Sequence, residues 1–244
     1  MNPSQNTILI TGGATGIGLA MAEQLLKAGS EVIVCGRRME MLNEAKQKFP
    51  ALHIEQTDLS KKESREKFAK YILEKMPSIN MLINNAGIQN ETDITNPDCN
   101  DSMQEEVGIN FIAPVHLASL FISHLKTKKE AAIINITSGL AFAPLAIVPV
   151  YCATKAALHS VTLSLRHQLR NTSIKVFEIA PPIVDTKLDR GGRDRRGVTD
   201  RGISAQEFAL AAMEAIKNDT LEAAIGMAAG LREKREAAFP FMNK

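Results

Sequence analysis

Short segments rich in β-branched residues alternate with segments of helical periodicity along almost the whole chain, and this alternation limits the possible folds most strongly. A succession of strand, helix and strand predicts a parallel sheet with helices covering both faces. We expect strands at 7–11, 31–35, 52–56, 79–83, 131–137, 174–179 and 222–227. We expect helices at 17–28, 39–48, 63–75, 103–125, 150–170 and 205–217.

Strand segments such as 133–136 are mostly apolar and show little alternation with polar residues, which is typical of parallel strands buried on both faces. The predicted fold class is therefore α/β, with a doubly wound, mostly parallel sheet of about seven strands flanked by helices. No repeat, linker or low-complexity segment divides the 244 residues, so we expect one domain over 1–244.

Composition argues against several other classes of protein. A net charge of +2 is too small to predict a nucleic-acid partner, and no uninterrupted apolar run approaches the ~18 residues of a membrane span. The cysteines Cys35, Cys99 and Cys152 are odd in number and far apart, which favours reduced thiols and a cytoplasmic location. No metal-ligand spacing is present, and the polar N-terminus predicts no secretory signal.

A glycine-rich turn follows the first predicted strand and precedes the first predicted helix. Glycines allow a tight turn and a close approach of pyrophosphate, and the start of the helix offers unpaired N–H groups to it. The strand and helix on either side make a nucleotide-binding turn more probable than a plain turn. The expected cofactor-binding residues here are Gly12, Thr15, Gly16, Ile17 and Gly18.

The end of the second predicted strand indicates which nucleotide is bound. A dinucleotide fold that takes NAD usually carries an acidic residue there, which holds the ribose 2′-hydroxyl. This chain has Arg37 and Arg38 instead. Guanidinium groups form charge-assisted, bidentate hydrogen bonds with phosphate. We therefore expect NADP(H), with Arg37 as the main ligand of the 2′-phosphate and Arg38 as a secondary one; the alternative is that both arginines only begin the second helix.

Tyr151 and Lys155 lie four residues apart at the start of a long predicted helix and so share one face. A nearby ammonium lowers the pKa of a phenol, which makes the pair suited to acid–base catalysis. Alone, this spacing is usually an ordinary helix face. Ser138, however, follows the strand at 131–137 and lies at the carboxyl end of the sheet, where ligands of such sheets bind.

The chain resembles the short-chain dehydrogenase/reductases, in the group with TGxxxGxG and YxxxK motifs and the DltE-type subgroup. The matching residues are the sequences TGGATGIG at 11–18, NNAG at 84–87 and YCATK at 151–155, together with Asn110 and Ser138. The resemblance covers essentially the whole chain and implies a Rossmann-type fold with NADP(H) as cofactor.

The resemblance also implies roles for residues. Tyr151 would protonate a carbonyl oxygen while hydride arrives from the nicotinamide, and Lys155 would lower the pKa of Tyr151 and bind the nicotinamide ribose. Ser138 would orient the carbonyl, and Asn110 would support a proton-relay water. Further cofactor contacts are implied for Asp58, Leu59, Asn85, Ala86, Gly87, Pro181, Val184 and Thr186.

Three local features refine these expectations. Pro114 has no N–H for the carbonyl of Asn110, so in a continuous helix that oxygen would be free to bind water. Pro182 replaces the glycine that the family usually has, which puts the local backbone path in doubt. The segment 187–203 is rich in Arg, Asp and Gly; it is either a solvated loop or, as its position after Thr186 favours, a mobile substrate lid.

The expected activity is hydride transfer between NADP(H) and a small-molecule carbonyl or secondary alcohol. A non-catalytic NADP(H) sensor is the main alternative, but it would be expected to lack part of the set Asn110, Ser138, Tyr151 and Lys155. An isomerase or dehydratase that uses the cofactor catalytically is a third possibility. By the same resemblance, the helices at 103–125 and 150–170 would pair between subunits of a homodimer or homotetramer.

Overall fold

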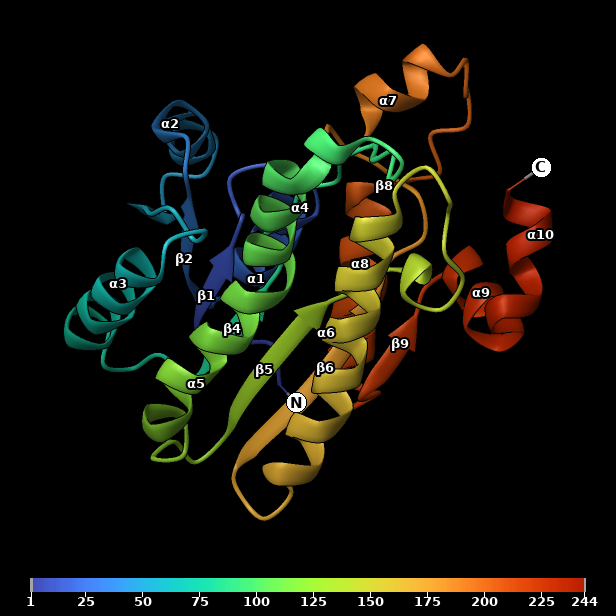
Figure 1. Ribbon diagram of the computed structural model, residues 1–244. Coiled ribbons are helices and arrows are strands. Elements are labelled where there is room, and N and C mark those ends of the chain that lie inside the picture. Colours follow the sequence, from blue (N-terminus) through green and yellow to red (C-terminus); the bar gives the residue numbers. More distant parts are fainter. Residues whose placement is uncertain (1, 244) are drawn as a thin grey trace.

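The computed structural model describes residues 2–243, apart from the side chain of Arg190. Its main element is a seven-stranded sheet with the order β3-β2-β1-β4-β5-β6-β9, in which every neighbouring pair is parallel (Figure 1). The seven strands are β1 (Thr7–Thr11), β2 (Glu31–Gly36), β3 (His53–Gln56), β4 (Met81–Asn84), β5 (Ala131–Ile136), β6 (Ile174–Ala180) and β9 (Glu222–Ala224). The predicted fold class is confirmed.

The central strands are buried on both faces because helices cover both. Every residue of β1, β4 and β5 is buried. One core cluster lies between the sheet and α1 (Gly16–Lys27), α2 (Met39–Lys48) and α8 (Ala205–Lys217). A second lies between the sheet and α3 (Lys62–Lys75), α5 (Ala113–Leu125) and α6 (Pro149–Gln168), the last two of which stand in front of the sheet in Figure 1.

The chain order places a crevice between two central strands. The chain runs from β1 outward to β2 and β3, then returns to β4 on the other side of β1. The connections after β1 and β4 therefore leave on opposite faces of the sheet. Such a switch point opens at the carboxyl ends of the strands, where open α/β sheets bind ligands.

The predicted helix at 103–125 is not one continuous α-helix, and that expectation was wrong. It consists of α4 (Asn100–Val107), the π-helical turn η2 (Gly108–Ile112) and α5, and the Ala113 amide donates to the Gly108 carbonyl. Pro114 cannot donate a backbone hydrogen bond, and a π-helical turn is one way in which a helix accommodates such an interruption. The 3₁₀ turn η1 (Pro97–Cys99) precedes α4.

The C-terminal part also differs from the expectation. The predicted strand 222–227 ends at Ala224, and Met227 instead begins α9 (Met227–Lys234), after Gly226 with φ of 56°. The structure adds the 3₁₀ turns η3 (Gly139–Ala141) and η4 (Arg235–Ala238) and the helix α10 (Phe239–Met242), none of which the sequence pattern predicted.

The segment 187–203 is not wholly irregular. It contains the short helix α7 (Arg190–Arg195) and ends in β8 (Ile203–Ser204), which pairs in parallel with β7 (Val184–Asp185). The Ile203 amide donates to the Ile183 carbonyl at 3.1 Å. The two ends of the segment are thus held side by side.

One helical run, Pro97–Leu125, is long and apolar enough to cross a membrane by length and composition, with a mean hydropathy of 1.4. The sequence contains no uninterrupted apolar run of ~18 residues, so we did not expect this helical run. In this structure its α5 part packs in the second core cluster, where Leu117, Phe121 and Leu125 are fully buried or nearly so.

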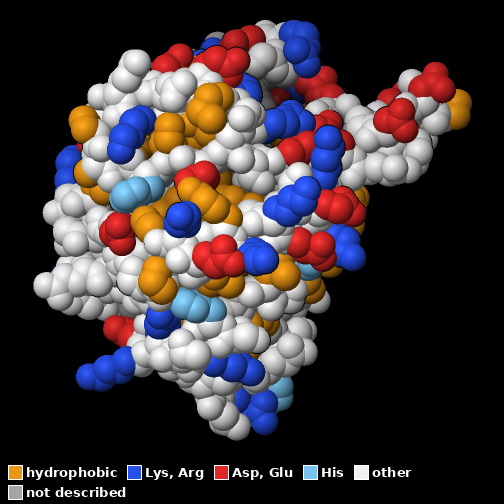
Figure 2. Space-filling model, turned by 90° about the vertical axis from the view of Figure 1, so that its left-hand side faces the viewer, with side chains coloured by type: hydrophobic (Ala, Val, Ile, Leu, Met, Phe, Trp, Pro, Cys, Tyr) orange, Lys and Arg blue, Asp and Glu red, His pale blue; other side chains and the backbone are white. Residues whose placement is uncertain are grey.

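The surface over the β2–β3 edge of the molecule carries both signs of charge. Figure 2 shows Lys and Arg side chains interspersed with Asp and Glu, with hydrophobic side chains between them. This mixture agrees with the small net charge of +2.

Candidate active site

The glycine-rich turn lies at the carboxyl end of β1 and leads into α1. Gly12 and Gly16 have φ values of 64° and 55°, in the left-handed region that favours glycine. A Cβ on Gly12 would lie 2.9 Å from the Cα of Ala86. The turn can therefore keep its close contact with the segment after β4 only with glycine at position 12.

The start of α1 is open to an anion. Thr15 is its N-cap residue and, among the described residues, supplies no side-chain hydrogen bond to the first turn, which includes Ile17 and Gly18. The amides of such a turn carry partial positive charge and seek acceptors. Together with the glycine turn, they fit the pyrophosphate of a dinucleotide.

The segment after β4 is hydrogen-bonded to the end of β1. The hydroxyl of Thr11 accepts from the amides of Asn85 and Ala86, both at 3.0 Å. The Asn85 side chain in turn donates to the carbonyls of Thr11, at 2.9 Å, and Gly12, at 3.1 Å. These bonds fix the two walls of the crevice relative to each other.

The residues expected at the adenosine end lie after β2 and β3. Arg37 pairs with Glu105 at 2.9 Å, and the two side chains are 60% and 43% exposed, so the pair contributes little to stability. Arg38 is the exposed N-cap residue of α2. Burial acts to raise the pKa of Asp58, but two hydrogen bonds from Ser60 and the charges of Lys61 and Arg37 together leave that pKa lowered. Leu59 is buried beside Asp58.

Tyr151 and Lys155 lie in the first turns of α6 and are both buried. The Lys155 Nζ donates to the carbonyl of Ile136, the last residue of β5, at 2.9 Å and lies 5.6 Å from the centre of the Tyr151 ring. Ser138 follows β5 and accepts from the Leu140 amide at 3.1 Å as the N-cap of η3. The predicted trio therefore meets at the carboxyl end of β5.

Burial has the largest effect on the pKa values of Tyr151 and Lys155 in this trio. Burial raises the pKa of Tyr151 above its ordinary value, although a hydrogen bond with Ser138 acts to lower it. Burial also lowers the pKa of Lys155 to about 8, against the opposing charge of Glu106. For Tyr151, desolvation outweighs the hydrogen bond with Ser138.

Asn110 occupies the middle of the π-helical turn and is buried. Its side chain exchanges two hydrogen bonds with the backbone of Ile88, each of 2.8 Å, and donates to the Thr154 hydroxyl at 3.2 Å. A Cβ on Gly87 would lie 3.3 Å from the Asn110 Oδ1 and 3.7 Å from the Lys155 Nζ. The Asn110 and Lys155 side chains thus both lie close to the position that a side chain at residue 87 would occupy.

The residues expected beside the nicotinamide follow β6. The Pro181 carbonyl accepts from the Gly139 amide at 2.9 Å, next to Ser138. Val184 is buried in β7, and a Cβ on Gly16 would lie 3.2 Å from the Thr186 Cγ2. Pro182 has a trans peptide bond, since the described residues contain no cis bond. The segment after β6 therefore reaches the glycine turn through Thr186.

Three residues near this site were missed by the sequence analysis. Glu106 is fully buried one helical turn before Asn110, Thr154 bonds Asn110, and Asp189 contributes to the raised pKa of Tyr151. The four-residue spacing between Glu106 and Asn110 could have placed both on one helix face. The position of Asp189 depends on the path of 187–203, which its composition could not predict.

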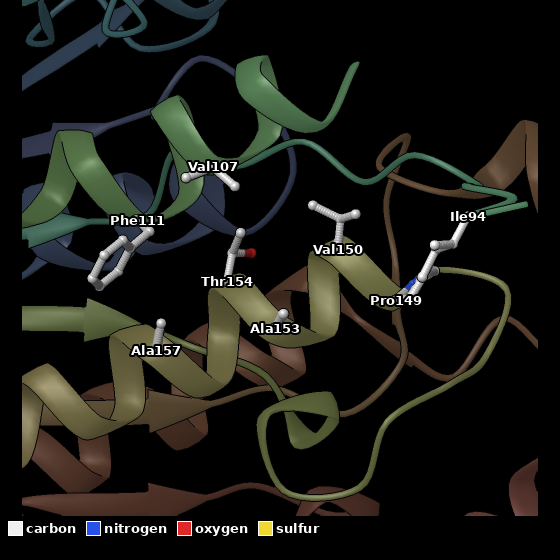
Figure 3. Close-up of a pocket in the computed structure, with 8 residues that line it drawn as sticks. All are labelled: Ile94, Val107, Phe111, Pro149, Val150, Ala153, Thr154 and Ala157. Atoms are coloured by element: carbon white, nitrogen blue, oxygen red, sulfur yellow. The ribbon is translucent and has the colours of Figure 1, made fainter. Parts of the chain in front are cut away.

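An apolar groove lies on the side of α6 that bears Ala153 and Ala157, with a volume of about 360 Å³. Figure 3 shows Val107 and Phe111 from α4 and η2 facing this side of α6, with Ile94 beyond Pro149. Thr154 lines the groove and also bonds Asn110. The groove therefore adjoins the candidate site through Thr154.

Comparisons with known proteins agree with this geometry. The sequence model of the family described as short chain dehydrogenase matches residues 6–197. The uncharacterized oxidoreductase DltE of Bacillus subtilis (strain 168) is 48% identical over 240 residues, covering 98% of this chain and 95% of that protein. A farnesol dehydrogenase of Aedes aegypti is 30% identical over 190 residues, covering 74% and 78% of the two chains.

Solved structures share the fold at lower identity. A short chain dehydrogenase/reductase from Burkholderia phymatum in complex with NAD has a TM-score of 0.88 at 21% identity and covers 100% of this chain and 97% of its own. A short chain dehydrogenase from Burkholderia cenocepacia J2315 in complex with NADP has a TM-score of 0.83 at 24% identity, with coverages of 96% and 94%.

Proposed function

The chain belongs to the short chain dehydrogenase family of oxidoreductases, and from this we propose that it transfers hydride between NADP(H) and a carbonyl or secondary alcohol of a small molecule. The observation that carries the proposal is the meeting of Ser138, Tyr151 and Lys155 at the carboxyl end of β5, beside the glycine turn. When bound, the nicotinamide supplies or accepts the hydride.

In the direction of reduction, Tyr151 donates its phenolic proton to the oxygen of the substrate carbonyl. A phenol is protonated at neutral pH, as a proton donor must be, because its ordinary pKa is about 10. Ser138 donates a hydrogen bond to the same oxygen. Lys155 stabilises the phenolate that forms and binds the ribose next to the nicotinamide, and Asn110 holds the Ile88 segment beside it.

The preference for NADP(H) over NAD(H) is argued from the residues that directly follow β2. The chain has no acidic residue there that would repel a 2′-phosphate, and Arg37 and Arg38 follow the strand directly. The exposed pair between Arg37 and Glu105 can exchange for a phosphate at little cost. The expected contacts of Asp58, Leu59, Asn85, Ala86, Gly87, Pro181, Val184 and Thr186 are part of this proposal.

Two further expectations accompany the proposed activity. The segment 187–203, whose ends are held together by β7 and β8, is the proposed substrate lid. The three cysteines are free, which supports the proposed cytoplasmic location.

The test is an assay of the purified protein with a panel of aldehydes and ketones and either NADPH or NADH. We expect oxidation of NADPH with at least one carbonyl compound, at a higher kcat/KM than with NADH. A higher kcat/KM with NADH would contradict the cofactor assignment. Tight NADPH binding without turnover on any compound would favour the non-catalytic sensor.

A further inference from the structure

Glu106 is a fully buried carboxyl group that the proposed mechanism does not use. It lies near the end of α4, one helical turn before Asn110. Its Oε1 accepts from the Asn90 amide at 3.3 Å. Its Oε2 is also buried and has no hydrogen-bond partner among the described residues. A buried carboxyl oxygen without a partner is costly, so its presence calls for a physical reason.

The bond to Asn90 places Glu106 in the support of the site. Asn110 holds Ile88 through two hydrogen bonds of 2.8 Å, and Glu106 holds Asn90 two residues further along. Both side chains come from the same face of the α4–η2 helix. The segment 88–90 is therefore fixed at two points, just after Gly87, whose Cβ position lies near both Asn110 and Lys155.

The carboxyl of Glu106 also acts on the groups of α6. Burial raises its pKa to about 7, while the Asn90 amide and the charge of Lys155 act to lower it. In return, Glu106 acts to raise the pKa values of Lys155, Tyr151 and Cys152. Asp189, which is ion-paired with Arg196 at 3.0 Å, is the other acidic group that acts on Tyr151.

We propose that Glu106 is a positioning residue of the active site, which fixes the segment 88–90 through the Asn90 amide and provides the buried countercharge that keeps Lys155 protonated. An ammonium in an apolar interior loses its proton readily unless a negative charge lies near it. The backbone carbonyl of Ile136 gives Lys155 a hydrogen-bond acceptor but no negative charge. The catalytic consequence of this inference rests on the proposed function, whereas the electrostatic coupling does not.

The first experiment follows the titration of the cofactor-free protein by NMR, with ¹³C labels in Glu and Lys side chains. In the wild type, we expect the Glu106 carboxyl to titrate near pH 7, well above the ordinary 4.5. In Glu106→Gln, which keeps an acceptor for the Asn90 amide, we expect Lys155 to titrate at lower pH than in the wild type. Titration of Glu106 near 4.5, or of Lys155 at an unchanged pH, would overturn the proposal.

A matched control is Asp101→Asn, which removes the same charge from an exposed position on the same helix. We expect it to leave the Lys155 titration unchanged. A shift equal to that of Glu106→Gln would show a general charge effect and overturn the proposal. The wild-type titration needs no variant, so it tests the proposal even if Glu106→Gln fails to fold.

The second experiment measures kcat/KM for carbonyl reduction against pH. We expect the loss in Glu106→Gln to grow from pH 6 to pH 8.5 and to reach about tenfold, because a change of one in pKa alters the protonation ratio tenfold. An equal loss of kcat/KM at every pH would show that Glu106 has a purely structural role, and would overturn the proposal that it is the countercharge of Lys155. If no carbonyl compound is reduced, only the proposed function fails, and the NMR titrations still decide the coupling.

Discussion

At the scale of single residues, the candidate site depends on three side chains that meet at the carboxyl end of β5 and on the burial that shifts their pKa values. The helical spacing of Tyr151 and Lys155, the position of Ser138 after a predicted strand and the family resemblance together predicted that the three side chains meet at the end of β5. Burial raises the pKa of Tyr151, and this contribution could not be predicted because it depends on residues distant in the sequence. The burial of Glu106 could not be predicted either, because it depends on the packing of α4 against α6.

Arg37 provides the residue-scale test of cofactor choice. Arg37→Ala should raise the KM for NADPH by about tenfold, which corresponds to loss of a charge-assisted contact of about 1.4 kcal/mol, and should change the KM for NADH little. Glu105→Gln, which frees Arg37 from its ion pair, should instead lower the KM for NADPH slightly. Steady-state kinetics with both cofactors measures the KM values of the two variants. Equal effects of Arg37→Ala on the two KM values would contradict the assignment to the 2′-phosphate.

At the scale of elements, strongly patterned segments were predicted well and the interruptions were not. The strand β1 and the helix α2 have the bounds that the pattern predicted. The helix at 103–125 divides at the π-helical turn because Pro114 breaks the backbone ladder, which periodicity alone does not detect. The short β7, β8 and α7 have too little apolar pattern to be predicted from sequence.

The contact between α1 and the segment after β4 gives an element-scale prediction. A Cβ on Gly18 would lie 2.5 Å from the Asn85 Nδ2 and 2.7 Å from the Gly12 carbonyl oxygen. Gly18→Ala should therefore displace the turn, lower the free energy of unfolding by about 1–3 kcal/mol and weaken NADPH binding. Chemical denaturation and calorimetric titration measure the two effects.

The control for this substitution is Gly230→Ala in α9, where an added Cβ meets nothing within 4 Å. Since alanine favours a helix over glycine by up to about 1 kcal/mol, this variant should be as stable as the wild type or more stable. A Gly18→Ala protein that behaves like Gly230→Ala would show that the turn has more room than the structure indicates.

At the scale of the whole molecule, the apolar groove along α6 is the surface that we expect a second copy of the chain to cover. It is lined by Val107, Phe111, Ala153 and Ala157 among others, and Ile112 on η2 is 46% exposed. The sequence resemblance predicted pairing of these helices between subunits. An apolar surface of this kind is typical of a protein interface.

Ala153→Arg tests the expected homodimer or homotetramer. Ala153 is exposed in the single chain, so the substitution should leave the fold intact while placing a charge in the interface. Light scattering should show a smaller assembly than the wild type, whereas Ala51→Arg, at an exposed turn between α2 and β3, should leave it unchanged. A wild-type protein that is monomeric at micromolar concentration would contradict the expectation.

The most direct test of the proposed activity is the turnover of Tyr151→Phe, measured with NADPH binding in the same preparation. Removal of the phenolic oxygen eliminates the proton donor but keeps the ring, so we expect kcat to fall by about 10²–10⁴-fold, while the Kd for NADPH stays close to that of the wild type. An unchanged kcat in this variant would contradict the assignment of Tyr151 as the general acid.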